Sequence, residues 1–315
     1  MKTPYLSWRW IVGGALVLAA PFYLGGYFLY IVSLTLVYSL SSFGMNILTG
    51  YTNLLSLAGA SFFGLGAYGA AILMAKYGFP FIVALAAVGL LAVIIGVVIA
   101  FPALRLEEVF LAISTLGFVF IFAEAAKSFS SLTGGSSGLG VPPLTFFGFQ
   151  LGEKAFYYVT LFIVSGLLLM GVNLSHSRFG RAFFAVKGSD LAARSIGIPA
   201  PRIKVIAFAV SSFYCAVSGG LYGVLLRFID PSIFNIFTSI SFLSMIIIGG
   251  LGSVLGSVLG AMFVIILPQL LTYFGLSEIQ RSVYGLAMIL SLMFLPNGLI
   301  SLPEKIRGLW RRKGA

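Results

Sequence analysis

Apolar runs follow one another along almost the whole chain, with short polar intervals between them. Most runs reach about 18 residues, which lets a helix cross the roughly 30 Å hydrocarbon core of a bilayer. A helix satisfies its own backbone hydrogen bonds, as a segment in lipid must. The pattern therefore predicts an all-α polytopic membrane protein. Its expected spans, about ten in number, are 10–28, 30–48, 58–75, 80–101, 109–127, 155–173, 205–227, 237–248, 254–272 and 279–296.

Two regions depart from this pattern. Residues 237–248 are too few for a full crossing and run directly into the glycine-rich stretch 249–252, while 44–61 is interrupted by the sequence TGYTN at 49–53. Short or broken segments in both halves of a chain are typical of a central binding path in transporters. Close helix packing through small residues is the alternative, and glycines four residues apart at 252, 256 and 260 favour it there.

The longest polar interval, 175–204, lies between two long apolar runs and holds six of the 19 basic residues. Its pattern indicates a short helix, which Ser189 and Asp190 can cap and which stops at Gly197. A helix with small residues on one face fits a groove on another protein. An amphipathic helix lying on anionic lipid is the other interpretation of the same residues.

The basic residues also predict an orientation. With the N-terminus inside, the inner segments hold fourteen Lys and Arg and the outer ends hold five. Cytoplasmic loops carry such an excess, so we expect both termini inside. The longest outer segment, 128–153, reads as an irregular loop. It closes over the mouth of a path, docks a soluble protein or is simply solvated.

The composition of the chain narrows the class of protein. With 60% hydrophobic and 9% charged residues, the chain has no room for a sizeable soluble domain, and we expect one transmembrane domain over 1–315. The net charge of +11 does not indicate nucleic acid, because the charges follow the topology and form no basic stripe. A single cysteine, Cys215, excludes an intrachain disulfide or a zinc cluster. Residues 1–10 lead into what reads as an uncleaved first span.

Catalytic chemistry is not supported. The one histidine, His176, has no carboxylate cluster beside it in the sequence, and no G-x-x-x-x-G-K-[ST] phosphate loop is present. We therefore expect no enzyme, no metal site and no cofactor bound by this chain. Glu124 is the one acid well inside an apolar run, with Lys127 on the same helix face. A chain of buried acids, usual in ion-driven carriers, is missing, which favours another energy source.

Several short motifs occur in order between about residues 30 and 300. The stretch from Leu191 to Gly197, L-A-A-x-x-x-G, is similar to the coupling loop of ABC importer permeases, with leucine at the position of a glutamate. The others are SRFGRA at 177–182, LSL at 55–57 with FFGLGAY at 62–68, TLGF at 115–118, LTGGSSGL at 132–139, IGGLGS at 248–253 and FLPNGL at 294–299. Together they resemble the permeases of branched-chain amino acid ABC importers.

The resemblance implies a fold like that of importers of the ribose and vitamin type, in the inner membrane of a bacterial or archaeal cell. It implies a second, different permease, an extracytoplasmic solute-binding protein and two cytoplasmic ATPases that bind ATP and magnesium. It also implies that 178–199 forms the helix that receives force from the ATPase. The residues that carry this coupling are then Arg178, Gly180, Arg181, Asp190, Ala192, Ala193 and Gly197.

In such a permease the interruptions at 49–61 and 249–253 line or shape a central path. The wall candidates, each with helix packing as the alternative, are Ser56, Ser61, Ser114, Thr115, Gly249 and Gly250. Val119 and Phe120 stand where relatives often carry Gly and Glu, which leaves branched-chain amino acids, urea, amides and other small solutes open. An ion-coupled secondary transporter is the alternative from another class.

Overall fold

The computed structural model describes residues 18–103, 108–146, 149–150, 152–275, 285–286, 289, 293 and 298–301. Residues 10–17 of the expected span 10–28, and most of the expected span 279–296, lie outside these residues. The long helices are α2 (Gly26–Asn46), α3 (Gly59–Tyr77), α4 (Phe81–Ala103), α5 (Glu108–Ser128), α7 (Glu153–His176), α10 (Ala200–Leu226), α11 (Ile236–Gly249) and α12 (Val254–Tyr273).

Six segments of the described ranges are long and apolar enough to cross a membrane: α2 with the π-helical turn η1 (Ile47–Tyr51), α4, α5, α7, α10 and α12. Helix α11 has 14 residues and agrees with the short span expected at 237–248. The helical, multi-pass class is therefore confirmed. The total of about ten helices and the orientation of the termini stay predictions.

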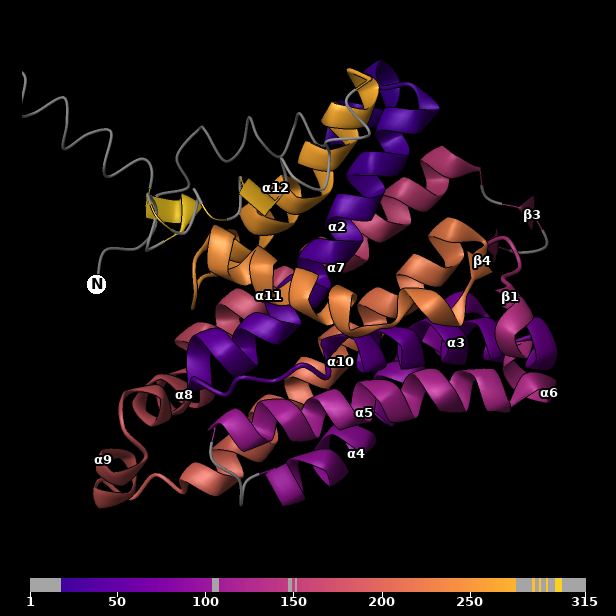
Figure 1. The fold of residues 1–315 in the computed structure, drawn as a ribbon. Coiled ribbons are helices and arrows are strands. Elements are labelled where there is room, and N and C mark those ends of the chain that lie inside the picture. The colour runs from indigo at the N-terminus through magenta and orange to yellow at the C-terminus, as the bar shows by residue number, and fades with distance from the viewer. Residues whose placement is uncertain are drawn as a thin grey trace, which may run out of the picture.

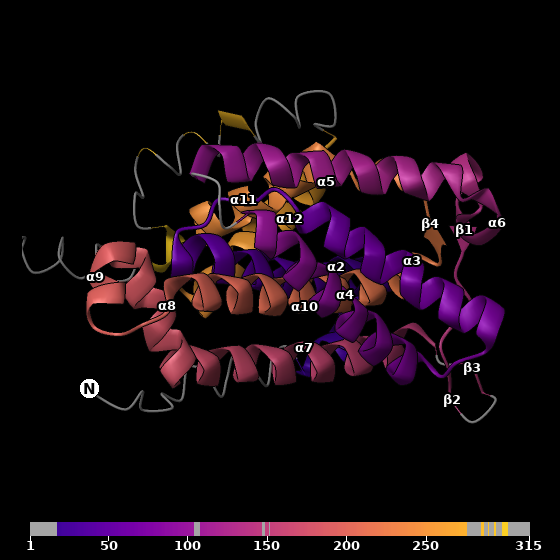
Figure 2. The same cartoon turned by 90° about the horizontal axis from the view of Figure 1, so that it is seen from below.

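The helices run side by side, and short elements occupy the two ends of the bundle (Figures 1 and 2). Helices α8 (Arg178–Gly188) and α9 (Asp190–Ser195) lie at one end, which we call the α8–α9 end. Helix α6 (Ser130–Thr133), the 3-10 turn η2 (Gly135–Ser137) and the small strands lie at the opposite end. Two further 3-10 turns are η3 (Pro231–Ile233) and η4 (Leu299–Ser301).

The segment 128–153 is more ordered than the irregular loop that its sequence predicts. Strand β1 (Leu139–Gly140) pairs antiparallel with β4 (Phe228–Ile229), and β2 (Thr145–Phe146) pairs with β3 (Phe149–Gln150). The ladder continues with the Val141 amide, which donates to the Arg227 carbonyl at 2.9 Å. These hydrogen bonds pair backbone N–H and C=O groups of the segment. Part of the segment is therefore fixed to the end of α10.

Helix α10 lies at the centre and packs against α2, α3 and α4. Small residues make this possible, because α3 and α10 touch through their backbones. A Cβ atom on Gly66 would lie 1.8 Å from the Ala216 carbonyl oxygen, and one on Gly219 would lie 1.8 Å from that of Phe63. Glycine is thus required on both helices at this crossing, as in other membrane bundles.

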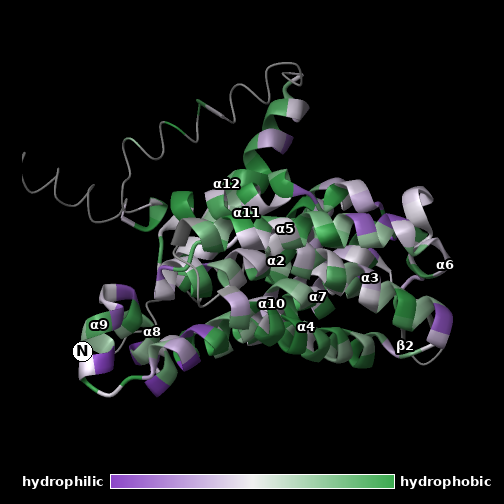
Figure 3. Ribbon diagram, turned by 60° about the horizontal axis from the view of Figure 1, so that its bottom comes forward, coloured by the Kyte–Doolittle hydropathy of each residue, from purple (hydrophilic) through white to green (hydrophobic). Residues whose placement is uncertain are grey.

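The outside of the bundle is apolar, as lipid demands. Helix α4 is hydrophobic along its length (Figure 3), and its large exposed side chains include Ile82, Leu90, Ile94 and Val98. A helix that is apolar all round suits a position between protein and lipid. Hydrophilic residues gather instead on α8 and α9 (Figure 3).

Candidate functional site

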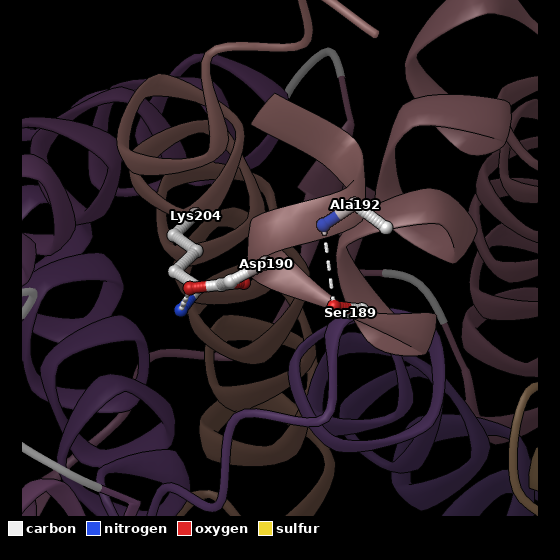
Figure 4. Close-up of polar contacts among 4 residues, drawn as sticks. All are labelled: Ser189, Asp190, Ala192 and Lys204. Carbon is white, nitrogen blue, oxygen red and sulfur yellow. Dashed lines mark hydrogen bonds and ion pairs between the residues drawn. The ribbon is translucent and has the colours of Figure 1, made fainter. Parts of the chain in front are cut away.

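The polar interval 175–204 forms two helices where the resemblance implies one over 178–199. Ser177 caps α8 by accepting from the Gly180 amide at 3.3 Å, and Ser189 caps α9 by accepting from the Ala192 amide at 3.2 Å (Figure 4). Ser189 has extended backbone angles, φ −168° and ψ 124°, so the chain turns between the helices. Serine favours this arrangement because its hydroxyl replaces a backbone partner at a helix start.

One side of this pair is fixed to the bundle. Phe183, Val186 and Ala193 are buried, and Gly180 has no room for a side chain, since a Cβ would lie 2.3 Å from the Ser175 carbonyl oxygen. The end of α9 is set by Gly197, whose φ of +82° is a left-handed conformation that favours glycine. The stop predicted at this position is therefore confirmed.

The other side faces outward. Of the predicted coupling residues, Arg178, Arg181, Ala192 and Gly197 are exposed, Asp190 is half-buried, and Gly180 and Ala193 are buried. Two large apolar side chains, Leu191 and Ile196, are 80% and 73% exposed. Sequence reasoning did not assign these two a contact role, although apolar residues in a polar helix are a usable signal. The outward face thus combines an apolar patch with basic residues, which suits a groove on a soluble protein.

Two hydrogen-bonded contacts orient the pair further. The Lys204 ammonium lies 2.5 Å from the Asp190 carboxylate and joins α9 to the first turns of α10 (Figure 4). The Arg181 guanidinium donates to the His176 carbonyl at 3.0 Å and covers the end of α7. The pair is therefore held at both of its ends by the helices on either side.

The LSL and TLGF motifs meet helix α11 at the first interruption, around Leu57. Its amide donates to the Thr115 hydroxyl of α5 at 2.9 Å, and its carbonyl accepts from the Ser239 hydroxyl of α11 at 2.6 Å. Ser239 also accepts from the Ala60 amide at 3.2 Å. The irregular chain before α3 is thus suspended between two helices far away in sequence, with its backbone groups satisfied.

The wall candidates near this point differ in their positions. Ser56 and Thr115 are buried on either side of Leu57, and Ser61 is buried with no hydrogen-bond partner for its hydroxyl among the described residues. Ser114 is exposed on α5 and does not join them. Their role in a path stays a prediction.

The second interruption is packed tightly. A Cβ on Gly249 would lie 1.8 Å from the Gly256 carbonyl oxygen, and one on Gly260 would lie 1.7 Å from that of Met245, so α11 and α12 touch through their backbones. Gly250 is buried, with Gly298 against it, since a Cβ on Gly298 would lie 2.5 Å from the Gly250 Cα. These contacts agree with the packing alternative for the small residues at 256 and 260.

A cavity of about 340 Å³ opens at the opposite end, between α2, α7 and α10. Glu153 and Arg227 bring opposite charges to it, and Leu29, Phe156 and Val224 give it an apolar wall. None of the wall candidates named from the sequence lines it. Over the described ranges, no group of three or more His, Cys, Asp or Glu side chains gathers in a way that would hold a metal ion.

Comparisons with known proteins agree with the motifs. The family described as "Branched-chain amino acid transport system / permease component" matches residues 27–292. The high-affinity branched-chain amino acid transport system permease protein LivM of Escherichia coli strain K12 is 30% identical over 310 residues, which covers 90% of this chain and 72% of the relative. A probable LivM permease of Methanocaldococcus jannaschii is 24% identical over 241 residues, covering 71% and 68%.

The sister permease type is similar over a shorter stretch. LivH of Escherichia coli strain K12 is 25% identical over 189 residues, covering 56% of this chain and 60% of the relative. No solved structure matches the chain. The family match over most of the chain and the similarity to LivM lead to one conclusion: the chain belongs to the permease family of branched-chain amino acid ABC transport systems.

Proposed function

We propose that this chain is the membrane-spanning permease subunit of an ATP-driven importer for branched-chain or related amino acids. The observation that carries the proposal is the α8–α9 pair, which is fixed to the bundle on one side and offers exposed Leu191 and Ile196 beside basic residues on the other. Such a surface fits a soluble ATPase subunit better than a lipid surface, because its apolar patch is small and its two helices are capped and separated. ATP hydrolysis then belongs to partner subunits, and this chain performs no covalent step.

The proposal includes an orientation and a set of partners. The α8–α9 end faces the cytoplasm, with both termini inside, about ten helices and a fold of the ribose and vitamin type. Two ATPases dock at that end, a solute-binding protein docks at the opposite end, and a second, different permease completes the path. The existence of both LivM and LivH relatives supports a pair of distinct permeases. A bacterial or archaeal inner membrane is the matching location.

The cavity at the opposite end supports an amino acid as the solute. A zwitterion with an apolar side chain needs one acidic group, one basic group and an apolar wall, and Glu153, Arg227 and Phe156 supply residues of these kinds. Cavities of roughly 300–1,000 Å³ are usual for small ligands. The cavity therefore fits the arrival of a branched-chain amino acid at the outer face.

An ion-driven carrier finds less support in the described residues. Glu124, the acid expected inside an apolar run, has a side chain that is 74% exposed and lies 3.8 Å from Lys127. This pair sits near the end of α5 and forms no buried acid chain. Exposed pairs of this kind are worth little, and they offer no route for a coupling ion.

The test is uptake by proteoliposomes that contain this chain with its ATPases and second permease. Labelled leucine, delivered by the binding protein, should accumulate only with ATP inside, and an ionophore that collapses ion gradients should leave the uptake intact. Urea and a simple amide serve as competing solutes in the same vesicles. Uptake that needs an ion gradient and ignores ATP would overturn the proposal, and preferred uptake of urea or amide would change the solute alone.

A further inference from the structure

We infer that Lys187 and Asn46 form a coupling bridge, which carries a displacement of α8 to both interruptions of the bundle. This inference rests on the proposed function, because it assigns a positioning role within ATP-driven transport. Neither residue belongs to the motifs singled out in the sequence. Both act through other groups and are positioning residues, with no contact to solute or nucleotide required.

Lys187 provides the first half of the bridge. It lies in the last turn of α8, half-buried, and its ammonium donates to the Gly50 carbonyl at 2.7 Å. Gly50 belongs to the π-helical turn η1 that ends α2, so the bond joins residues 137 positions apart. The neighbouring ring of Phe184 lies 4.8 Å from that of Tyr51, measured between centroids. One face of α8 therefore holds the first interruption through a charged and an aromatic contact.

Asn46 provides the second half. Its side chain is fully buried, and its amide nitrogen donates to the Ser253 carbonyl and to the Ser257 hydroxyl, both at 2.8 Å. Its amide oxygen accepts from the Gly252 amide at 2.8 Å. The last residue of α2 thus grips the glycine turn and the start of α12. Buried polar groups that are fully paired specify one arrangement of their surroundings.

The two halves of the bridge are in close contact around Gly50 and Gly252. A Cβ on Gly50 would lie 1.8 Å from the Asn46 amide oxygen and 2.5 Å from the Gly252 nitrogen. A Cβ on Gly252 would lie 3.2 Å from the Gly50 oxygen and 3.8 Å from the Lys187 ammonium. Packed interiors transmit displacement because they have few voids to absorb it. A shift of α8 therefore moves the end of α2 and the start of α12 together.

The local backbone is also irregular at this place. A π-helical turn leaves the regular hydrogen-bond pattern and is frequent at functional sites. Asn53, just after it, has a φ of +57°, a left-handed conformation that non-glycine residues rarely adopt. The bridge thus attaches where the backbone departs from regular helix geometry.

The test is Lys187→Met in the full reconstituted transporter, with uptake and ATP hydrolysis measured on the same vesicles. We expect the complex to assemble and to hydrolyse ATP, while solute moved per ATP falls by roughly tenfold, the scale of one charged hydrogen bond. Lys187→Arg should restore most of the ratio, because it keeps a donor. The matched control is Lys76→Met, since Lys76 also donates to a backbone carbonyl, that of Ser131, but at the opposite end.

A milder variant keeps the inference falsifiable if Lys187→Met does not assemble. Ser257→Ala removes one of the two acceptors of the Asn46 amide and should lower solute moved per ATP by about threefold. A normal ratio in Lys187→Met, or an equal loss in Lys76→Met, overturns the inference, as does a normal ratio in Ser257→Ala when only that variant assembles. If the unmodified transporter shows no ATP-driven uptake, the proposed function itself fails.

Discussion

The two ends of this molecule differ in how their exposed elements are attached. At the α8–α9 end, two capped helices connect through Lys187 to the interruptions in the middle of the bundle. At the opposite end, the ladder of β1 and β4 ties the segment 128–153 to the end of α10, and Lys76 of α3 donates to the Ser131 carbonyl, beside an open cavity. Under the proposed function, the first end passes movement inward and the other receives the solute.

The largest expected effect comes from a substitution at the crossing of α3 and α10, which should affect both ends of the molecule. Gly219→Val places side-chain atoms where the Phe63 carbonyl lies 1.8 Å from an added Cβ, and overpacking of this kind costs about 3 kcal/mol. Thermal unfolding of the purified chain in detergent should shift strongly downward. Gly166→Val on α7 is the control, since no atom lies within 4 Å of its Cβ position. Equal unfolding temperatures for the two variants would contradict this account of the core.

A second change addresses the α8–α9 end alone. Gly197→Val forces a β-branched residue into a left-handed conformation, which costs roughly 1–2 kcal/mol and displaces the end of α9. We expect insertion and folding to persist while ATP-driven uptake falls by about tenfold. Gly188→Val, also exposed on this pair but with ordinary φ and free space, should transport normally. Uptake that is unchanged in Gly197→Val would show that the position of α9 does not matter.

A third change addresses the opposite end. Gly138 has a φ of +76°, and a Cβ on it would lie 2.6 Å from the Ile229 carbonyl oxygen. Gly138→Val should therefore distort the β1–β4 ladder, at roughly 1–3 kcal/mol, and reduce the stimulation of ATP hydrolysis by loaded binding protein several-fold. Basal hydrolysis should stay constant, because the bridge is untouched. Gly140→Val, with no atom within 4 Å, is the matched control, and an equal loss of stimulation in it would argue against the ladder.

The smallest expected effect concerns the ion pair between Asp190 and Lys204. Its side chains are 40% and 20% exposed, and exposed pairs contribute about 0.2–1 kcal/mol. Asp190→Asn should lower uptake by less than about fivefold and leave assembly intact. The loss should shrink further in high salt, which screens what remains of the interaction. A loss as large as that of Gly197→Val would mean that Asp190 contacts the partner directly.

The sequence predicted the features that depend on neighbouring residues. The cap at Ser189 and the stop at Gly197 follow from local backbone preferences, and both are present. The break between α8 and α9 could also have been predicted, because Ser189, which caps the start of α9, also ends α8. The long apolar runs likewise located the long helices, since a segment in lipid must satisfy its own backbone hydrogen bonds.

Contacts between distant residues were not predictable in the same way. The bonds of Leu57 with Thr115 and Ser239 join three segments far apart in the sequence, and no one segment indicates its partners. Asn46 was a missed signal, because an amide near the end of an apolar run must find partners in the bundle. The β1–β4 ladder escaped prediction because strands of two residues carry no alternation to detect.

The crossing of Gly66 and Gly219 restricts how this protein can change shape. With carbonyl oxygens seated where side chains would otherwise stand, α3 cannot slide or turn on α10 without steric collision. We expect α3 and α10 to keep this contact through the proposed transport cycle. The opening and closing of a passage would then depend on the elements around this pair, among them the π-helical turn η1.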